Sequence, residues 1–373
     1  MSTEILQYYI GLANIMEVGV MDRKCGIAIV GYGGMGSWHA KLLSTMPEVN
    51  LKGIYDILPK RAEAARSAGI FAYETFDAVL EDKTVELITI AIPNDLHHDI
   101  AIQAMEAGKN VVCEKPVALN SIELQEMIDA AVKNKVIFTV HQNRRWDEDY
   151  LITKQLYDKE TLGKVFNIES RVHGSRGIPG DWRNTKKCGG GMVLDWGVHL
   201  IDQILMMLSD RKLLSLFATL SYVTNEEVDD GFKILLNYAN NLSCQIEVGT
   251  SNFISLPRWY LEGENGTAVI EDWSKNGKIV MVSDWEKRDA VPVVTSAGLT
   301  KTMAPRTKET IQEYPLPQIT SDVKDFYRNV IKAIDGKEEI LVKHPEIMKS
   351  MRVMEAVMQS AQTNQVVRFE DGM

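Results

Sequence analysis

The sequence predicts an α/β protein: a doubly wound parallel sheet near the N-terminus, then an α+β part with a large open, mostly antiparallel sheet. Strand and helix patterns alternate with short connections from Lys24 to about Val140, which is typical of a parallel sheet covered by helices. Beyond that point strand patterns follow one another, which favours an antiparallel sheet with helices on one face. A length of 373 residues exceeds one ordinary core and fits two domains.

We therefore expect an N-terminal extension over residues 1–22, a doubly wound domain over 23–142 and a second domain over 143–373. Residues 1–22 are fairly apolar but carry Glu4 and Glu17, without a basic region before them or a cleavage site after them. Two alternatives remain for this segment: a start upstream of Met21, or a helical arm that packs on the body or on a partner subunit.

The elements of the first domain are predicted from apolar runs and from the residues that begin or end helices and strands. Gly26 to Val30 is the first strand, and the apolar run 87–92 suits a central parallel strand. Gly108 ends one helix, and Ser121 is expected to cap the next. The other expected strands are 51–55, 71–73, 110–113 and 136–140, and the expected helices are 37–45, 61–68, 76–81, 99–107 and 121–133.

The second domain opens with a helix and a strand, followed by a loop rich in Gly, Arg and Lys from His173 to Gly191. Residues 285–318 are poor in regular pattern and are expected to form a long excursion. The expected helices are 150–159, 192–208, 321–334 and 344–363, and the expected strands are 164–172, 214–224, 231–238, 242–250, 258–262 and 267–271.

The turn G-Y-G-G-M-G at 31–36 lies between the first strand and a helix. Gly31 permits the tight turn, Gly33 lets the backbone approach a pyrophosphate, and Gly36 allows the helix to pack closely on the strand. Free N–H groups at the helix N-terminus suit phosphates. Glycine-rich turns are common, but the strand before and the helix after make this one a predicted dinucleotide site.

Asp56 closes the second strand, twenty positions beyond Gly36. A carboxylate there accepts hydrogen bonds from the adenosine ribose hydroxyls and repels a 2′-phosphate, which favours NAD over NADP. The alternative is an ordinary turn aspartate ahead of Pro59. Lys60 and Arg61 follow closely and could soften the discrimination between the two cofactors.

Two further segments follow strands at the edge where ligands bind in open α/β sheets. I-P-N-D-L-H at 92–97 follows one strand, and E-K-P at 114–116 follows the next. A lysine at a strand end is usually a solvated charge. Lys115, fixed by the proline after it and directed toward the crevice, could instead hydrogen-bond a substrate hydroxyl.

Asp195 and His199 lie four residues apart in a predicted helix and should share one face. An imidazole beside a carboxylate forms a general acid/base with an orienting partner, suited to moving a hydroxyl proton. The alternative is a buried histidine bonded to a backbone carbonyl. No third ligand with metal-site spacing follows, so we expect no metal.

Composition excludes several classes of function. The net charge of −10 and a pI near 5.3 argue against nucleic acid as a partner. Four widely spaced cysteines indicate reduced thiols of a cytoplasmic protein rather than a disulfide framework. No apolar run is long enough to span a membrane.

The motifs at 31–36, 92–97 and 114–116, with G-G-G-M-V-L-D-W-G-V-H-L-I-D at 189–202, resemble the Gfo/Idh/MocA dehydrogenases, the glucose-fructose oxidoreductase and inositol dehydrogenase family. The resemblance extends from residue 24 to 373. H-Q-N-R-R-W-D at 141–147 and the tail from Asp322 to Phe369 look most like the scyllo-inositol-dehydrogenase-like branch. Some relatives in that branch prefer NADP, against which Asp56 argues here.

The resemblance implies a Rossmann domain that binds NAD, a polyol or sugar substrate, and a homodimer or homotetramer that pairs through the exposed face of the second sheet. The implied catalytic residues are Lys115, Asp195 and His199. The implied substrate contacts are Lys115, Arg144, Asp195 and His199. The implied cofactor contacts are Gly31, Tyr32, Gly33, Gly34, Met35, Gly36, Asp56, Ile92, Pro93, Asn94, His97, Glu114, Lys115, Asn143, Trp182 and Arg183.

The leading hypothesis is therefore an NAD-dependent dehydrogenase acting on a secondary hydroxyl of a cyclic polyol or sugar, in which the cofactor carries the redox chemistry. One alternative is a sensor that binds dinucleotide without turnover, against which intact Lys115, Asp195 and His199 argue. Another is a glycosidase that uses tightly held NAD⁺ for transient oxidation and produces no net NADH.

Overall fold

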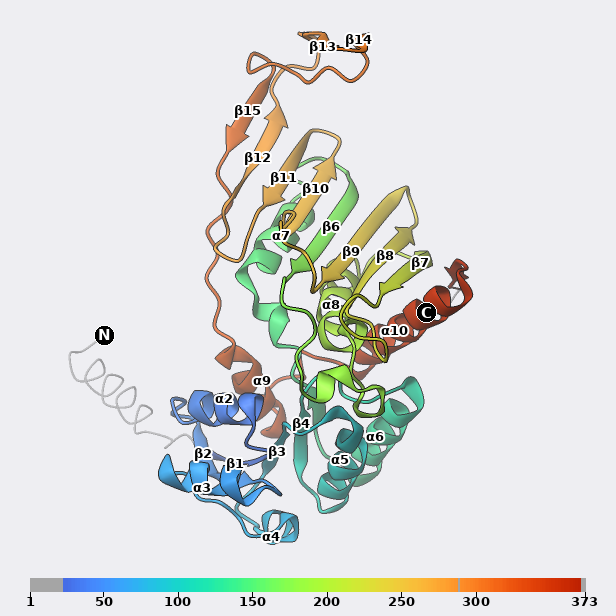
Figure 1. The fold of residues 1–373 in the computed structure, drawn as a ribbon. Coiled ribbons are helices and arrows are strands. Elements are labelled where there is room, and N and C mark those ends of the chain that lie inside the picture. The colour runs from blue at the N-terminus through green and yellow to red at the C-terminus, as the bar shows by residue number, and fades with distance from the viewer. Residues whose placement is uncertain (1–22, 288, 370–373) are drawn as a thin grey trace, which may run out of the picture.

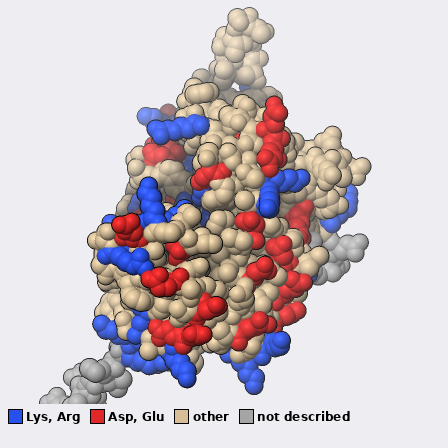
Figure 2. Space-filling view, turned by 60° about the horizontal axis from the view of Figure 1, so that its bottom comes forward, with Lys and Arg blue, Asp and Glu red and all other residues tan. Residues whose placement is uncertain are grey.

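The computed structural model describes residues 23–287 and 289–369 and places two sheets one after the other along the chain (Figure 1). The segment 1–22, for which two alternatives remain, lies outside the described residues. The acidic and basic side chains are interspersed over the face shown in Figure 2. Within the described residues, no helix is both long and apolar enough to cross a membrane.

The first sheet has five parallel strands in the order β2-β1-β3-β4-β5, as the alternation of elements predicts. Every residue of β1 is buried, which explains why that strand reads as a continuous apolar run. The strands are β1 (Cys25–Val30), β2 (Val49–Tyr55), β3 (Leu87–Ile90), β4 (Asn110–Cys113) and β5 (Phe138–Val140). The helices that connect them are α2 (Gly34–Leu43), α3 (Pro59–Ser67), α4 (Phe76–Glu81), α5 (His97–Glu106) and α6 (Ser121–Asn134).

Two local predictions in this part are wrong. Residues 71–73 form only a single bridge, between Ala72 and Ile54, because the chain turns away after that pair. The cap of α6 is Asn120, whose side chain accepts from the backbone N–H groups of Ile122 and Glu123, rather than Ser121. An asparagine oxygen at this position satisfies two N–H groups that the helix itself leaves free.

The second sheet has nine strands in the order β15-β12-β11-β10-β6-β9-β8-β7-β16, antiparallel except where β6 pairs with β9. Helices α7 (Glu148–Asp158), α8 (Val198–Met207) and α10 (His344–Thr363) lie against one face (Figure 1). The strands are β6 (Val165–His173), β7 (Leu213–Ser221), β8 (Gly231–Tyr238), β9 (Leu242–Gly249), β10 (Trp259–Gly263), β11 (Gly266–Ile270), β12 (Gly277–Val282), β15 (Ile311–Tyr314) and β16 (Val367–Arg368).

The expected excursion over 285–318 is more regular than its sequence pattern suggests. It carries a small hairpin, β13 (Val293–Thr295) with β14 (Gly298–Thr300), that projects beyond the large sheet in Figure 1. The chain then returns as β15 to pair with β12 at the sheet edge. Most side chains of this arm are exposed, so its sequence lacks the alternation of apolar and polar residues that predicts strands.

Helix α9 (Lys324–Ile334) returns from the second sheet to the first and lies beside α2 (Figure 1). The Tyr327 hydroxyl approaches His39 Nδ1 at 2.8 Å and Thr89 Oγ1 at 3.1 Å. Arg328 also forms an ion pair with Glu48. Helix α9, from the C-terminal part of the chain, therefore packs on the first sheet and its helix α2.

Candidate active site

The glycine turn after β1 has the geometry that a dinucleotide pyrophosphate requires. Gly31 has φ +94°, and a Cβ there would come within 2.2 Å of Ala91 O. A Cβ on Gly36 would come within 2.0 Å of Gly31 O, whereas one on Gly34 would meet nothing within 4 Å. Helix α2 starts here without a side-chain cap, so its first N–H groups face the open side of the turn. Tyr32 and Met35 belong to the same turn.

Asp56 fixes the glycine turn from the neighbouring strand. Its Oδ2 accepts the Tyr32 N–H at 2.7 Å, and its Oδ1 accepts the Leu58 N–H at 2.8 Å. Arg61 Nη1 lies 3.4 Å from Oδ2, and the Arg61 guanidinium also lies closest to the position of a Cβ on Gly33. A carboxylate and a guanidinium therefore stand together where an adenosine ribose would meet this sheet.

Two buried polar side chains, His97 and Asn94, connect the loop after β3 to other segments of the site. His97 is fully buried, with Nδ1 2.9 Å from Pro116 O and Nε2 3.0 Å from Ile92 O. Burial lowers the pKa of His97. Asn94 donates to Gly189 O at 3.0 Å and so links the first loop to the segment that precedes Asp195. These contacts fix the loops at the edge of the sheet. Contact of His97 or Asn94 with the cofactor stays a prediction.

Lys115 and Asp195, predicted from two separate motifs, form an ion pair. Lys115 Nζ lies 3.0 Å from Asp195 Oδ1 and 3.0 Å from Asp195 O. Arg183 Nε approaches the other carboxylate oxygen, Oδ2, at 3.1 Å. Burial alone would raise the pKa of Asp195, but Lys115 and Arg183 outweigh that effect and lower it. The Asp195 carboxylate thus stays ionised between two cations.

His199 is buried beside this pair, and its Nδ1 has no hydrogen-bond partner. Burial, reinforced by the charges of Lys115 and Arg144, holds the pKa of His199 well below its ordinary value. The imidazole is therefore neutral near pH 7 and able to accept a proton. The expected pairing of His199 with Asp195 is not what the structure shows, because both Asp195 oxygens are bonded to Lys115 and Arg183.

The local backbone explains this difference. Val193–Gly197 is a π-helical turn, and the α-helix begins only at Val198. The wider turn changes the angle between positions four apart, so Asp195 and His199 do not superpose as in one regular α-helix. Asp229 holds the start of this segment, since its Oδ2 accepts the Val193 N–H at 2.9 Å. Burial raises the pKa of Asp229 to about 6.

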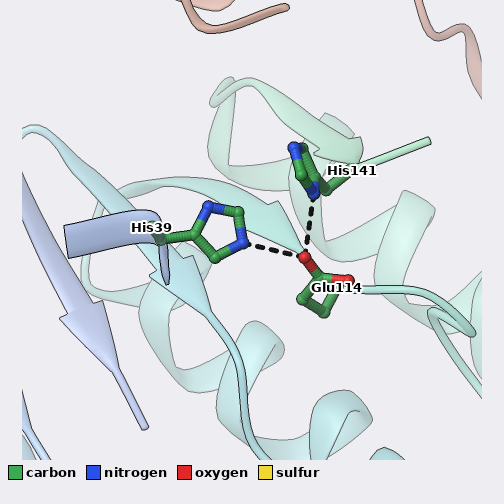
Figure 3. Close-up of side chains that lie close together, drawn as sticks. All are labelled: His39, Glu114 and His141. Carbon is green, nitrogen blue, oxygen red and sulfur yellow. Dashed lines mark hydrogen bonds and ion pairs between the residues drawn. The ribbon is translucent and has the colours of Figure 1, made fainter. Parts of the chain in front are cut away.

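Behind Lys115, the Glu114 carboxylate is enclosed by two histidines (Figure 3). His39 Nε2 and His141 Nδ1 each lie 2.8 Å from Glu114 Oε1. Burial alone would raise the pKa of Glu114, but the imidazoles outweigh it and hold that pKa well below the ordinary value. Burial lowers the pKa of His39, so this ring donates as a neutral imidazole.

Among the described residues, these three are the group of His, Cys, Asp and Glu whose ligand atoms could surround a metal ion, all within 4.8 Å. The same atoms already bond to one another, and His39 Nδ1 bonds to the Tyr327 hydroxyl. His141 Nε2, in contrast, is buried without a hydrogen-bond partner. That the protein uses no metal stays a prediction.

A cavity of about 350 Å³ adjoins the Lys115–Asp195–His199 group, within the range that small-molecule sites occupy. Trp196, next to Asp195, forms part of its wall and also contacts His199 with ring centroids 6.0 Å apart. Arg144 and Trp273 line the same cavity, with Arg144 Cζ 4.3 Å from the Trp196 ring centroid.

Some predicted site residues have no contact with the catalytic group. Asn143 begins the short turn after β5, and Trp182 stacks beneath Arg183 with Cζ 4.4 Å from its ring centroid. Conversely, the motifs did not point to Trp273, Asp229, or the two histidines around Glu114. A tryptophan in the turn D-W-S-K-N-G is the one local signal that could have found Trp273.

Two family models match this chain. "Oxidoreductase family, NAD-binding Rossmann fold" matches residues 25–142, and "GFO/IDH/MocA C-terminal domain" matches residues 150–269. The chain belongs to the Gfo/Idh/MocA family. It is therefore an NAD(P)-dependent oxidoreductase, as its motifs predicted.

This Gfo/Idh/MocA protein resembles the crystal structure of an NAD-binding protein from Listeria innocua, at 45% identity and a TM-score of 0.90, over 93% of this chain and 100% of that one. It is 24% identical to scyllo-inositol 2-dehydrogenase (NADP(+)) IolW of Bacillus subtilis, over 91% of this chain and 96% of that protein. It is also 32% identical to glucose-6-phosphate 3-dehydrogenase of Bacillus subtilis, over 48% of this chain and 52% of that protein.

Proposed function

We propose that this protein oxidises a secondary hydroxyl of a cyclic polyol or sugar, with Lys115, Asp195 and His199 as its catalytic residues. The observation that supports this most is the Lys115–Asp195 ion pair at the edge of the first sheet, with a neutral, buried imidazole beside it. The names of the two Bacillus subtilis relatives, an inositol dehydrogenase and a sugar-phosphate dehydrogenase, agree with this substrate class.

In the proposed reaction, His199 takes the proton from the substrate hydroxyl as the carbon–oxygen bond becomes a carbonyl. Lys115 Nζ donates a hydrogen bond to the same oxygen and stabilises the negative charge that develops on it. Asp195 keeps the ammonium in position through the 3.0 Å contact. When bound, the nicotinamide accepts the hydride from the substrate carbon.

The proposed cofactor lies along the glycine turn, Asp56, the two strand-end loops and Asn143, Trp182 and Arg183. NAD is the preferred form in this proposal, because the Asp56 carboxyl group would face a 2′-phosphate. Arg61 beside it is the group that would accept such a phosphate. Asp56→Ala is expected to raise the ratio of kcat/KM for NADP⁺ to kcat/KM for NAD⁺. Arg61→Ala is expected to lower the same ratio.

We also propose that the protein is cytoplasmic and that two copies pair through the face of the large sheet opposite α7, α8 and α10. That face presents Phe217 opposite Leu235, and Tyr260 opposite Val269. Leu235 is 41% exposed, which favours a partner covering this face.

The test is the initial rate of reduced-cofactor formation with a panel of inositols, aldoses and sugar acids, run with NAD⁺ and NADP⁺ in parallel. Turnover of a ring substrate, lost in Lys115→Ala and His199→Ala but kept in the exposed-loop control Lys187→Ala, would support the proposal. Cleavage of aryl glycosides without net reduction of cofactor would replace it with the glycosidase alternative.

A further inference from the structure

Two arginines and three tryptophans form a connected group of contacts beside the cavity, in which the Trp196 and Trp273 ring centroids lie 6.1 Å apart. Arg144 Cζ lies 4.3 Å from the Trp196 ring centroid and 5.3 Å from that of Trp273. Arg258 Cζ lies 4.7 Å from Trp273 on one side and 5.0 Å from the buried Trp259 on the other. Contacts of this length are attractive cation–π interactions. Trp273 is thus held by two guanidinium groups rather than by an apolar core.

Trp273 stays 51% exposed although it is held firmly. It lies in the turn between β11 and β12, where Asp272 accepts hydrogen bonds from Ser274 and Asn276. Lys275, in the left-handed conformation, forms an ion pair with Glu148. An indole fixed on a rigid turn, with half its surface open beside a cavity, is suited to contact a ligand with little loss of conformational freedom.

The cations around this cavity are already paired with carboxylates. Arg144 binds Asp147 at 2.9 Å, and Arg258 lies 3.1 Å from Asp149. Lys115 and Arg183 share Asp195. The wall consequently offers little net positive charge to an anion, but it does offer two flat apolar surfaces. The buried Nε of Arg144 has no hydrogen-bond partner, which leaves one donor of this guanidinium unused beside the two indoles.

We propose that Trp273 is a specificity-determining residue that, with Trp196, packs against the C–H face of an uncharged six-membered polyol or sugar ring. Arg144, beside both indoles, donates to a ring hydroxyl. The inference rests on the proposed function and adds to it the shape and charge of the substrate. Trp273 lies beyond residues 150–269, which the family's C-terminal model matches, so this selection belongs to a part of the chain outside the shared motifs.

The test compares Trp273→Ala, Trp273→Phe and a matched control on the best ring polyol of the panel. The control is Trp285→Ala, because Trp285 is also exposed and also stacks with an arginine, Arg306 at 4.8 Å, but lies on the projecting arm. Trp273→Ala is expected to raise KM about tenfold with kcat within about twofold, the pattern for lost uniform binding. Trp273→Phe should keep most of the affinity, and Trp285→Ala all of it.

Two further measurements separate the outcomes. Without any turnover, the polyol should change the intrinsic fluorescence of wild type and Trp285→Phe to the same extent, and that of Trp273→Phe less, because only Trp196 then reports the ligand. The open-chain hexitol with the same number of carbons and hydroxyl groups, and the matching sugar acid, should both have a higher KM than the ring polyol. An unchanged KM in Trp273→Ala, or a preference for the acid, overturns this inference while leaving the dehydrogenase intact. A wild type that oxidises no ring substrate overturns the proposed function, and this inference with it.

Discussion

The Asp195 carboxylate bonds two cations at once, Lys115 and Arg183. Lys115 comes from the edge of the first sheet, and Arg183 comes from the loop before the π-helical turn. An aspartate in this position orients the ammonium and offsets its charge in a buried setting, where an unpaired cation would be costly.

Replacing Asp195 by Asn keeps the shape but removes that negative charge. We expect kcat to fall on the order of 10²-fold, the lower range for loss of assisted proton transfer, while the dissociation constant of NADH changes little. Steady-state rates and cofactor titration check this. Asp181→Asn is the matched control, since Asp181 also bonds Arg183, at 2.8 Å, but from an exposed position. Equal losses in both variants would contradict the assignment.

The low pKa of His199 sets the expected pH dependence of oxidation. The proposed base must be neutral, and burial together with Lys115 and Arg144 holds its pKa well below 6.5. The rate should therefore stay level as the pH falls through 6.5 and decline only at lower pH. Arg144→Met removes one of the neighbouring charges, so the acid limb of the kcat profile should move to higher pH. A limb that does not move would argue against His199 as the base.

Lys115, Asp195 and His199 could be selected from the sequence because each belongs to a short local motif, but their partners could not be predicted. Asp195 shares a helical segment with His199, yet it bonds Lys115, which is 80 positions away in the chain. Trp273 and Arg144 are still farther apart, and no periodicity within either segment relates them. Contacts of this kind depend on how the two sheets meet.

At the scale of elements, Asp229 fixes the segment that carries Asp195 and His199. It bonds the Val193 N–H at the start of the π-helical turn, and Gly191 passes so close that a Cβ would come within 2.3 Å of Asp229 Oδ1. The helix thus has its cap supplied from the strand region before β8 rather than from its own N-terminal residue.

Asp229→Ala should cost about 1 kcal/mol of stability, as for loss of a helix cap, and should lower kcat because the catalytic segment shifts. Thr75→Ala is the matched control. It removes the cap of α4, where Thr75 Oγ1 accepts the Ala78 N–H at 3.1 Å, remote from the catalytic group. Thermal unfolding should show a similar loss for both variants, and only Asp229→Ala should lose activity. Full activity of Asp229→Ala would contradict the role of Asp229 in positioning the segment that carries Asp195 and His199.

Elements with strong patterns were predicted well, and irregular ones were not. The prediction for α10 matches its bounds from His344 to Thr363, because a long amphipathic pattern is hard to mistake. The π-helical turn at Val193–Gly197 has the same residue types as an α-helix, so only the structure reveals it. The projecting arm lacks a buried face, and with it the alternation that signals strands.

At the scale of the whole molecule, the uncovered face of the large sheet supports a prediction about assembly. Leu235→Asp combined with Val269→Asp places two charges on that face, and we expect it to convert a dimer or tetramer into a smaller species. Light scattering coupled to size exclusion measures the mass. The control Val132→Asp adds a charge at another exposed apolar position, on α6, where the side chain is 69% exposed. A double variant with unchanged mass would rule out this face.

The two-sheet architecture followed from the sequence because a change from alternating elements to successive strands is visible along the chain. The division at residues 142 and 143 stays a prediction. The return of α9 to the first sheet could not be anticipated. Phe326 and Tyr327 are buried against His141 and His39, and in the sequence they read only as the apolar stripe of one more helix.

That return has a consequence for how the protein is made. Tyr327 leaves the ribosome about 190 residues after the last strand of the first sheet, an interval of about 10–40 s at about 5–20 residues per second. Until then, His39 and the Glu114 carboxylate lack the cover that α9 provides. The part of the first domain that receives α9 thus stays uncovered through most of the synthesis of the second domain, and α6 waits longer still for its contact with α10.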